Sequence, residues 1–425
     1  MKKDAIAVIG AGAAGLMAAI MAARAAADAR VMALDGAARI GAKILIAGGG
    51  RCNVTHHVVT ERDFHGSTPA AIRRVLRAFD VDATRAFFEA EGVRLKQEAT
   101  GKLFPVSDRA QDVLQALLGA ARRAGVELLH PCRVTAIRDQ GDDGFVLEVT
   151  GSEPRPSLRA GAVILATGGK SVPKTGSDGS GYALATGLGL PLTPRLFPAL
   201  VPLRLPDGDR LRALSGLAMD VRLTVVSATG RHLAQVSGAL LCTHQGVSGP
   251  AVLDVSRAWQ AARSEDPDAA VLVNWLPALA SDAVDLQLQQ HGRRPIRRAL
   301  APPLPDRLAD ALCGLADVDP DASAATLARD ARKRLVAACT AWRLPLVGTR
   351  GFEVAEVTAG GVPLAALNAG LEARTRPGLF VCGELCDVDG RIGGFNFQWA
   401  WASGTVAGRA AAARVLRGSR PPVSR

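Results

Sequence analysis

The chain has 425 residues, of which 48% are hydrophobic and 21% are charged, and its formal net charge is +11. This length predicts two or three domains, and the composition is that of a soluble globular protein, which excludes a disordered chain. Only 4% of the residues are aromatic, so ring stacking cannot be the main way of holding a partner unless these few residues are concentrated at one site. The basic excess suggests an anionic partner, although a composition rich in Ala and Arg explains it equally well.

The N-terminal segment has some features of a secretion signal, because Lys2 and Lys3 precede an uncharged run over 5–23. The glycine spacing described next argues against that interpretation, and no other stretch is long enough to span a bilayer. Seven cysteines without zinc-like spacing predict neither a disulfide scaffold nor a metal site. We therefore expect a cytoplasmic protein with no membrane partner.

Residues 5–15 predict a dinucleotide-binding unit. An apolar strand over 5–9 leads into Gly10-x-Gly12-x-x-Gly15 and a helix over 16–27. Gly10 makes the tight turn, Gly12 lets the backbone approach a pyrophosphate, and Gly15 lets the helix pack closely on the strand. A second strand over 30–34 places Asp35 about 20 residues beyond, where an acid binds the ribose hydroxyls.

Gly48, Gly49 and Gly50 are followed by Arg51, Cys52 and Asn53, which predicts a loop lying against a ligand rather than a flexible linker. Helices are expected over 70–79, 82–91 and 110–124, and strands over 126–129, 132–138 and 145–149 form a small accessory sheet. An apolar strand over 162–165 ends in Ala166, Thr167 and Gly168, whose small side chains leave room for a dinucleotide.

A proline-rich boundary at 191–202 introduces an inserted domain. Its expected strands cover 221–226 and 239–242, and its expected helices cover 282–298, 305–315 and 324–342. Strands over 356–362 and 378–384 and a helix beginning near Asn396 then resume the first pattern. The segment 391–425 contains six arginines and no acid, and its final dozen residues read alternatively as a disordered basic tail.

Taken together, these motifs are specific. The chain resembles the BaiN/RdsA family of bacterial FAD-dependent oxidoreductases, also called aminoacetone-oxidase-like, in GAGAAG, IGAKILIAGGGRCNVT, TGKLFPVSDRA, THQGVSGPAVL, VTAGGV and GELCDVDGRIGGFNFQWAWASG. The resemblance implies an α/β fold: a glutathione-reductase-like FAD-binding Rossmann domain from residues 1–193 and 356–425, interrupted by a β-barrel-like plus helical domain over 194–355. His56 departs from the usual Asn, and Cys382 and Cys386 replace apolar residues, which argues against a redox pair.

The resemblance also implies the cofactor contacts. The residues expected to bind the pyrophosphate, adenosine and crevice side of FAD are Gly10, Gly12, Ala14, Gly15, Asp35, Val134, Ala166, Thr167 and Gly168. Those expected to bind its ribityl-phosphate and flavin side are Lys43, Gly50, Arg51, Cys52, Asn53, Gly383, Glu384, Asp389, Gly394, Phe395, Asn396 and Gln398. The helix starting near Asn396 would lie beneath the ring and stabilise its anionic reduced form.

Family members reduce a conjugated C=C bond in a bile acid or in a ribosomal RNA uridine. The first hypothesis is therefore reduction of uridine to dihydrouridine in 23S ribosomal RNA, with NADPH or NADH as a transient donor and no DNA partner. The alternatives are a reductase or oxidase of a small enone or amine, and an RNA-binding factor with a structural FAD. Cys52 is a candidate proton donor, with Arg51 lowering its pKa, or else a small packing residue. Asn396 is the second catalytic candidate, and the oligomeric state stays open.

Overall fold

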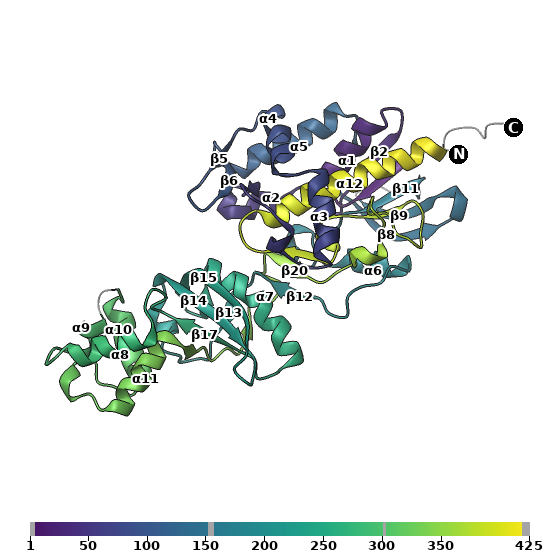
Figure 1. The fold of residues 1–425 in the computed structure, drawn as a ribbon. Coiled ribbons are helices and arrows are strands. Elements are labelled where there is room, and N and C mark those ends of the chain that lie inside the picture. The colour runs from purple at the N-terminus through teal and green to yellow at the C-terminus, as the bar shows by residue number, and fades with distance from the viewer. Residues whose placement is uncertain (1–4, 152–156, 301–302, 419–425) are drawn as a thin grey trace. The chain divides into compact units, whose positions relative to one another are not determined.

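The computed structural model describes residues 5–151, 157–300 and 303–418. The chain separates into two compact units (Figure 1): unit 1 comprises residues 1–198 and 356–425, and unit 2 comprises residues 199–355. Each unit has its own buried apolar core. No helix in the described ranges is long and apolar enough to cross a membrane.

Unit 1 is built on a five-stranded parallel sheet. Its strands, in spatial order, are β21 (Leu379–Val381), β11 (Ala162–Leu165), β1 (Ala5–Ile9), β2 (Arg30–Leu34) and β7 (Glu127–Leu129). The strands are short and almost entirely apolar, as expected for a sheet that is covered on both faces. Because β21 follows the inserted segment, both ends of the chain are needed to complete this sheet.

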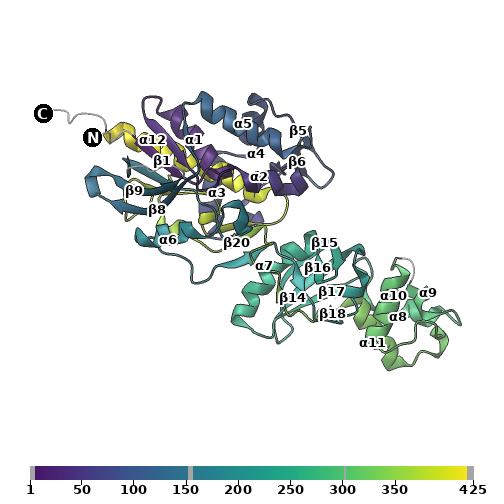
Figure 2. The same cartoon turned by 180° about the vertical axis from the view of Figure 1, so that it is seen from behind.

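Two helices pack closely beside the sheet. Helix α1 (Ala13–Ala25) lies along α12 (Phe395–Gly418), as Figures 1 and 2 both show. A Cβ atom on Gly404 would lie 2.4 Å from the carbonyl oxygen of Ala14, and one on Gly408 would lie 2.3 Å from that of Ala18. The two glycines therefore let the helix backbones approach more closely than any side chain would allow.

The remaining elements of unit 1 surround this core. Its other helices are α2 (Ala42–Ile46), α3 (Pro69–Ala78), α4 (Val81–Ala90), α5 (Ala110–Arg123) and α6 (Ser180–Gly187), together with short 3-10 turns. Its smaller sheets are β3 (Thr55–His56), β6 (Lys102–Pro105) and β5 (Leu95–Gln97); β10 (Leu158–Ala160), β9 (Phe145–Gly151) and β8 (Cys132–Asp139); β4 (Phe64–Gly66) with β22 (Val388–Gly390); and β12 (Phe197–Ala199) with β20 (Val357–Ala359).

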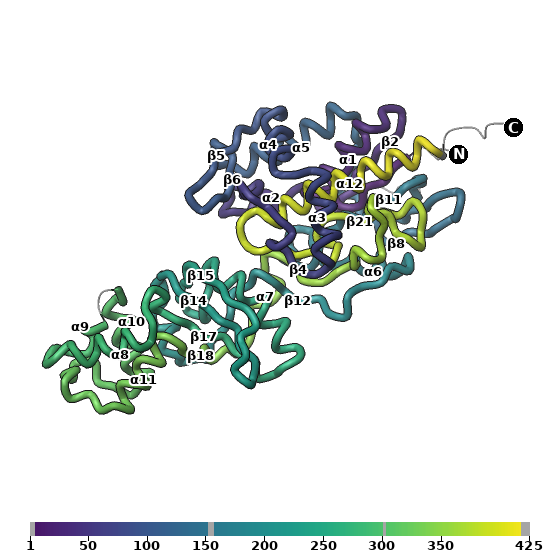
Figure 3. The backbone as a smooth tube through the Cα atoms, in the orientation of Figure 1, coloured from purple at the N-terminus to yellow at the C-terminus, as the bar shows by residue number. Residues whose placement is uncertain are grey.

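Unit 2, whose backbone path can be followed in Figure 3, contains a seven-stranded antiparallel sheet and a set of helices. The strands, in spatial order, are β18 (Trp342–Arg343), β17 (Ala270–Asn274), β14 (Ala218–Val226), β15 (His232–Thr243), β16 (Gly246–Ser248), β13 (Leu203–Arg204) and β19 (Gly348–Thr349). The helices are α7 (Pro250–Glu265), which packs on β14 and β15, and α8 (Ser281–Gln290), α9 (Ile296–Leu300), α10 (Asp306–Leu315) and α11 (Arg329–Thr340).

Several predicted elements differ in the structure. The strand at 126–129 pairs with β2 in the main sheet instead of joining the accessory sheet. The helix expected over 282–298 ends at Gln290, because the chain turns through Gly292 at φ +66° and resumes as α9 after Pro295. The helix expected over 324–342 begins only at Arg329. The proposed basic tail is helical as far as Gly418, and residues 419–425 lie outside the described residues.

Candidate cofactor and active site

The glycine turn after β1 leaves an open space next to the backbone. Gly10 donates a hydrogen bond to the carbonyl of Leu34 at 2.7 Å and has a φ of +97°. A Cβ atom on Gly15 would lie 1.8 Å from the carbonyl oxygen of Gly10, whereas one on Gly12 would meet no atom within 4 Å. Gly12 therefore borders free space at the N-terminus of α1, where unpaired N–H groups favour an anion.

The carboxylate of Asp35 lies at the end of β2 beside this turn. It accepts hydrogen bonds from the backbone N–H groups of Ala11 and Ala37, each at 2.8 Å. These bonds tie the glycine turn to the loop after β2. The side chain is partly exposed, so a ligand can reach it. Its place after β2 is the one in which the sequence predicts an acid for the ribose hydroxyls.

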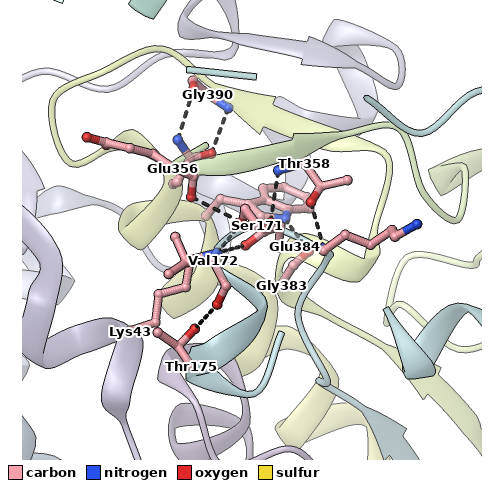
Figure 4. A network of polar contacts seen from close by, with 12 residues as sticks. Lys43, Ser171, Val172, Thr175, Glu356, Thr358, Gly383, Glu384 and Gly390 are labelled. Carbon is pink, nitrogen blue, oxygen red and sulfur yellow. Dashed lines mark hydrogen bonds and ion pairs between the residues drawn. The ribbon is translucent and has the colours of Figure 1, made fainter. Parts of the chain in front are cut away.

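A second polar centre joins the beginning and end of the chain (Figure 4). The carboxylate of Glu384 accepts hydrogen bonds from Lys43 Nζ at 2.6 Å, Ser171 Oγ at 2.7 Å and the Thr358 N–H at 2.9 Å. Lys43 also donates to Ser171 Oγ at 2.5 Å. Because only 16% of the Glu384 side chain is exposed, three donors stabilise a carboxylate that burial alone would disfavour.

Ser171 and Thr358 were not identified from the sequence. The signal in the sequence was a pair of glycines within three residues of each, and the structure adds that both side chains are buried. Buried hydroxyl groups need partners, but the chain separation between Ser171, Thr358 and Lys43 hides the fact that all of them meet at Glu384. The fold brings together Lys43 and Glu384, which the resemblance had assigned separately to the cofactor.

Most residues of the loop over 48–52 adopt left-handed backbone conformations, which favour glycine. Gly48, Gly49 and Gly50 have φ values of +58°, +69° and +85°, and a Cβ atom on Gly49 would meet no atom within 4 Å. Cys52 also has a positive φ, of +60°, and its N–H donates to the carbonyl of Ala47 at 2.9 Å. The loop thus exposes bare backbone at Gly49 and Gly50.

The predicted lowering of the Cys52 pKa is wrong. Protein atoms bury its side chain completely, and this desolvation raises the pKa of the thiol to about 12. Arg51 points elsewhere: it pairs with Glu98 at 2.6 Å and lies over the ring of Phe104 at 4.0 Å. The structure therefore makes Cys52 a small packing residue of the loop.

The first turn of α12 directs several predicted contacts into the protein. Asn396 accepts a hydrogen bond from the N–H of Gly390 at 2.8 Å and donates one to its carbonyl at 2.9 Å. Gln398 is almost fully buried; it accepts from Thr55 Oγ1 at 2.7 Å and donates to the carbonyl of Phe79 at 2.9 Å. Both amides hold the fold, so these two residues have mainly backbone to offer a cofactor.

Phe395 is also fully buried, and its ring stacks on His56 with centroids 4.9 Å apart. The Phe395 side chain therefore packs within the protein, and a contact of this residue with the flavin ring stays a prediction. The preceding Gly394 has a φ of +93°, and a Cβ atom there would lie 2.7 Å from backbone atoms of Thr55. The sequence showed that this turn needs glycine but not which way the following side chains point.

Other predicted residues line the same end of the parallel sheet. Ala166 donates its N–H to the carbonyl of Ile9 at 2.9 Å, and its own carbonyl oxygen would lie 2.5 Å from a Cβ atom on Gly10. Gly383 faces Ala14, whose Cβ would be 2.7 Å from a Cβ placed on that glycine. The glycine turn, the end of β11 and the end of β21 are therefore neighbours.

Three further predicted residues are placed as follows. Val134 is a buried residue of β8 at an irregularity in its pairing with β9. Asp389 is buried in β22 opposite His65 of β4. Gly168 has a φ of +75°, and a Cβ atom on it would lie 2.6 Å from Ser177 Oγ.

These residues fit a dinucleotide cofactor. Gly12, Gly49 and Gly50 present backbone to open space. Among the described residues, Asn53 Oδ1 and Thr167 Oγ1 are buried without a hydrogen-bond partner, which leaves them available to polar groups of a bound cofactor. Within the same described ranges, no cluster of three His, Cys, Asp or Glu side chains is arranged to hold a metal ion.

Comparison with known protein families identifies the family of this chain. The model of the HI0933-like protein Rossmann domain matches residues 4–410. The chain belongs to this family. Members of the family are FAD-dependent oxidoreductases, and the βαβ unit with its glycine turn is the family's nucleotide-binding fold.

Curated relatives cover nearly the whole chain. It is 37% identical over 415 residues to the 3-dehydro-bile acid delta(4,6)-reductase of Clostridium scindens, covering 96% of this chain and 99% of that protein. It is 34% identical to the ribosomal RNA dihydrouridine synthase of Escherichia coli, covering 94% and 96% of the two chains. The enzyme of the same name from Haemophilus influenzae is 31% identical, with coverage of 93% and 95%.

Solved structures share the fold at low sequence identity. A quinol-fumarate reductase is 16% identical with a TM-score of 0.52, and the match covers 98% of this chain and 72% of that one. The 3-ketosteroid delta1-dehydrogenase of Sterolibacterium denitrificans is 13% identical with a TM-score of 0.50, covering 96% and 100%. These likenesses confirm the predicted FAD-binding Rossmann fold and carry no statement about substrate.

Proposed function

We propose that this protein is an FAD-dependent reductase of a conjugated C=C bond, and that its substrate is a uridine of 23S ribosomal RNA. The observation that carries the proposal is the combination of an almost full-length match to two ribosomal RNA dihydrouridine synthases with a glycine turn that leaves open space at Gly12 for a dinucleotide. The net charge of +11 also suits a polyanionic substrate.

The residues of the crevice have distinct tasks in this proposal. The backbone at Gly12 and the N-terminus of α1 hold the diphosphate of FAD, and Asp35 accepts hydrogen bonds from the adenosine ribose. Glu384, fixed by Lys43 and Ser171, presents a carboxylate to the ribityl hydroxyls. When bound, FAD supplies the hydride that adds to the carbon β to a carbonyl.

In this proposal, the N-terminus of α12 stabilises the negative charge of the reduced flavin. Its first turn contains no acid, so the positive end of the helix dipole stabilises negative charge nearby. A proton must still reach the α carbon of the substrate. Cys52 is a poor source, because its thiol is completely buried and its pKa is raised to about 12.

A small enone is the second candidate substrate. The observation that favours it is the 37% identity to a bile acid reductase, and the bond chemistry would be the same. The two candidate substrates would be bound in different ways. A steroid needs an apolar pocket, whereas a uridine in RNA needs cations for its phosphates and must leave the base stack. NADPH or NADH is proposed as the transient donor, because the sequence contains one dinucleotide fingerprint, which FAD occupies in this proposal.

The test combines reduction and product analysis. The purified protein should be yellow, and anaerobic NADPH or NADH should bleach its flavin. Incubation with 23S ribosomal RNA from a strain lacking the gene should then produce dihydrouridine, detected by nuclease digestion and mass spectrometry. Turnover of a 3-oxo-Δ4 steroid without any dihydrouridine would select the enone reductase instead. If the protein binds RNA but NADPH and NADH fail to reduce its flavin, the result would select the binding factor with a structural FAD.

A further inference from the structure

Unit 1 carries a cluster of arginines from three neighbouring segments, which we call the α3 surface. Its members are Arg62 of the 3-10 turn at Glu61–Asp63, Arg73, Arg74 and Arg77 of α3, and Arg391 before α12. All five residues are exposed. The cluster was not distinguished by the sequence, where 391 is far from the other positions.

The amphipathic pattern of α3 sets the direction of its arginines. Ile72, Val75 and Leu76 are buried, and α3 packs against α12. Arg74 and Arg77 are three positions apart on the opposite face, so they lie next to each other on the helix surface. The same packing that builds the core therefore presents these two guanidinium groups outward.

Acidic side chains neutralise only part of the α3 surface. Arg73 pairs with Glu61 at 2.6 Å, and Arg391 pairs with Asp63 at 2.8 Å. Arg74 and Arg77 make no ion pair with any residue in the described ranges. Asp80, which follows α3, is engaged as the cap of α4, where it accepts a hydrogen bond from the Ala83 N–H at 2.9 Å. Five cations against two paired acids leave the cluster with a net positive charge.

One member of the α3 surface, Arg391, adjoins the turn before α12. Arg391 donates its N–H to the Asp63 carbonyl at 3.0 Å and places its guanidinium 4.3 Å from the ring centroid of Phe395. Phe395 begins α12 directly after Gly394, in the turn that the resemblance assigns to the flavin ring. Phosphate bound at Arg391 would therefore lie beside the turn that the resemblance assigns to the flavin, and the phosphates that follow it could extend towards Arg74 and Arg77.

We propose that the α3 surface binds backbone phosphates flanking the uridine that is reduced, an inference that rests on the proposed function. Arginine forks match phosphate geometry, and unpaired cations bind a polyanion by releasing its counterions. A steroid has no phosphates and would not use these side chains. The surface would thus distinguish an RNA substrate from a small enone at the same crevice.

The test removes Arg74 and Arg77, two of the three arginines of the α3 surface that make no ion pair within the described ranges, and compares the result with a matched change elsewhere. The variant is Arg74→Gln with Arg77→Gln. The control is Arg329→Gln with Lys333→Gln on α11, which also removes two exposed cations that form no ion pair within the described part of the chain and changes the net charge equally. Flavin content and bleaching by NAD(P)H should match the wild type in both, because none of the four residues lies in the cofactor crevice.

The readouts are binding to a 23S ribosomal RNA fragment at several salt concentrations and the rate of dihydrouridine formation. For the α3 variant, the slope of log K against log salt should become shallower by about 1.8, and kcat/KM should fall about tenfold or more with kcat retained. The control should keep both values. Equal losses in the two variants, or no loss in either, would overturn the inference. If the wild type still formed dihydrouridine in that case, the proposed function would stand. A wild-type protein that forms no dihydrouridine would reject both.

Discussion

Gly12 and Gly15 belong to the same short turn but are glycines for different reasons. A side chain at Gly12 would enter space that no protein atom occupies, whereas one at Gly15 would collide with the carbonyl oxygen of Gly10. The first position is thus free for a ligand and the second is fixed by packing. Substitution of each residue separates cofactor binding from folding.

We expect Gly12→Ala to fold like the wild type but to retain little flavin, because the added methyl group occupies the proposed position of the diphosphate.

Gly15→Ala should lower the free energy of unfolding by about 3 kcal/mol or more, because its Cβ would lie 1.8 Å from Gly10 O. Flavin absorbance per mole of protein and guanidinium unfolding measure the two effects. Full flavin content in Gly12→Ala would show that the open space is not the phosphate site.

Cys52 and the other six cysteines are predicted to be unreactive in the folded protein. All seven cysteines, which lie in the described ranges, are buried thiols rather than disulfides, and desolvation raises the pKa of Cys52, Cys339 and Cys382 to about 12. At pH 8 only about one in ten thousand such thiols is a thiolate, which is the nucleophilic form. Native protein should therefore incorporate no iodoacetamide by mass spectrometry, and guanidinium-unfolded protein should incorporate seven equivalents. Rapid native labelling of Cys52 would restore it as a reactive residue.

At the scale of elements, α12 connects the core with the candidate site. Its first turn borders the crevice, and its middle packs on α1 through Gly404 and Gly408. Alanine is a better helix former than glycine by about 1 kcal/mol, so replacement of a helical glycine normally stabilises. Close backbone contact should reverse this sign.

We expect Gly408→Ala to destabilise the protein by about 1–3 kcal/mol, because its Cβ would lie 2.3 Å from the Ala18 carbonyl oxygen. Gly119→Ala in α5 is the matched control, since the nearest atom is the flexible end of Arg123 at 3.2 Å. That change should stabilise by up to about 1 kcal/mol. Denaturant unfolding of both variants gives the comparison. A stabilising effect of equal size in both would contradict the close packing of α1 and α12.

The sequence predicted elements whose signal is local. The strand over 30–34 has its predicted bounds, and the helix over 110–124 differs by one residue, because strand and helix periodicities are strong there. Sheet membership was not local: 126–129 resembles its neighbours in sequence but pairs with β2 instead. Helix α7 was overlooked, because Gly249 and Pro250 read as loop residues although proline suits the first position of a helix.

The candidate site shows the same division. Glycine positions and Asp35 follow from the chemistry of a phosphate-binding turn, which is written within a short stretch of sequence. The side-chain directions of Gln398 and Phe395 depend on Thr55, Thr84 and His56, which approach from distant segments. No periodicity within α12 reveals those partners. Long-range polar contacts such as the one between Lys43 and Glu384 are hidden for the same reason.

At the scale of the whole molecule, the two units differ in how the chain builds them. Unit 1 requires both chain ends, since β1 and β21 belong to one sheet and α1 packs on α12. Unit 2 is continuous in sequence and encloses its own core, which includes the fully buried Trp275. Segments near its two ends are neighbours, because the Arg350 N–H donates to the Pro202 carbonyl at 3.0 Å. A continuous unit with adjacent ends is the arrangement that tolerates separation from its host.

We therefore expect the fragment 199–355 to fold alone, with a single cooperative transition in guanidinium. Unit 1 should also survive without it, because β12 pairs with β20 and neighbouring strands are only about 5 Å apart, a gap that a few Gly and Ser residues span. Residues 1–198 joined by such a linker to 356–425 should remain folded and hold flavin, whereas 1–198 alone should not fold, since it lacks β21 and α12. Circular dichroism and flavin absorbance distinguish these cases. Loss of flavin from a linked protein that is otherwise folded would mean that unit 2 contributes to the cofactor site, and flavin binding by 1–198 alone would contradict the shared sheet.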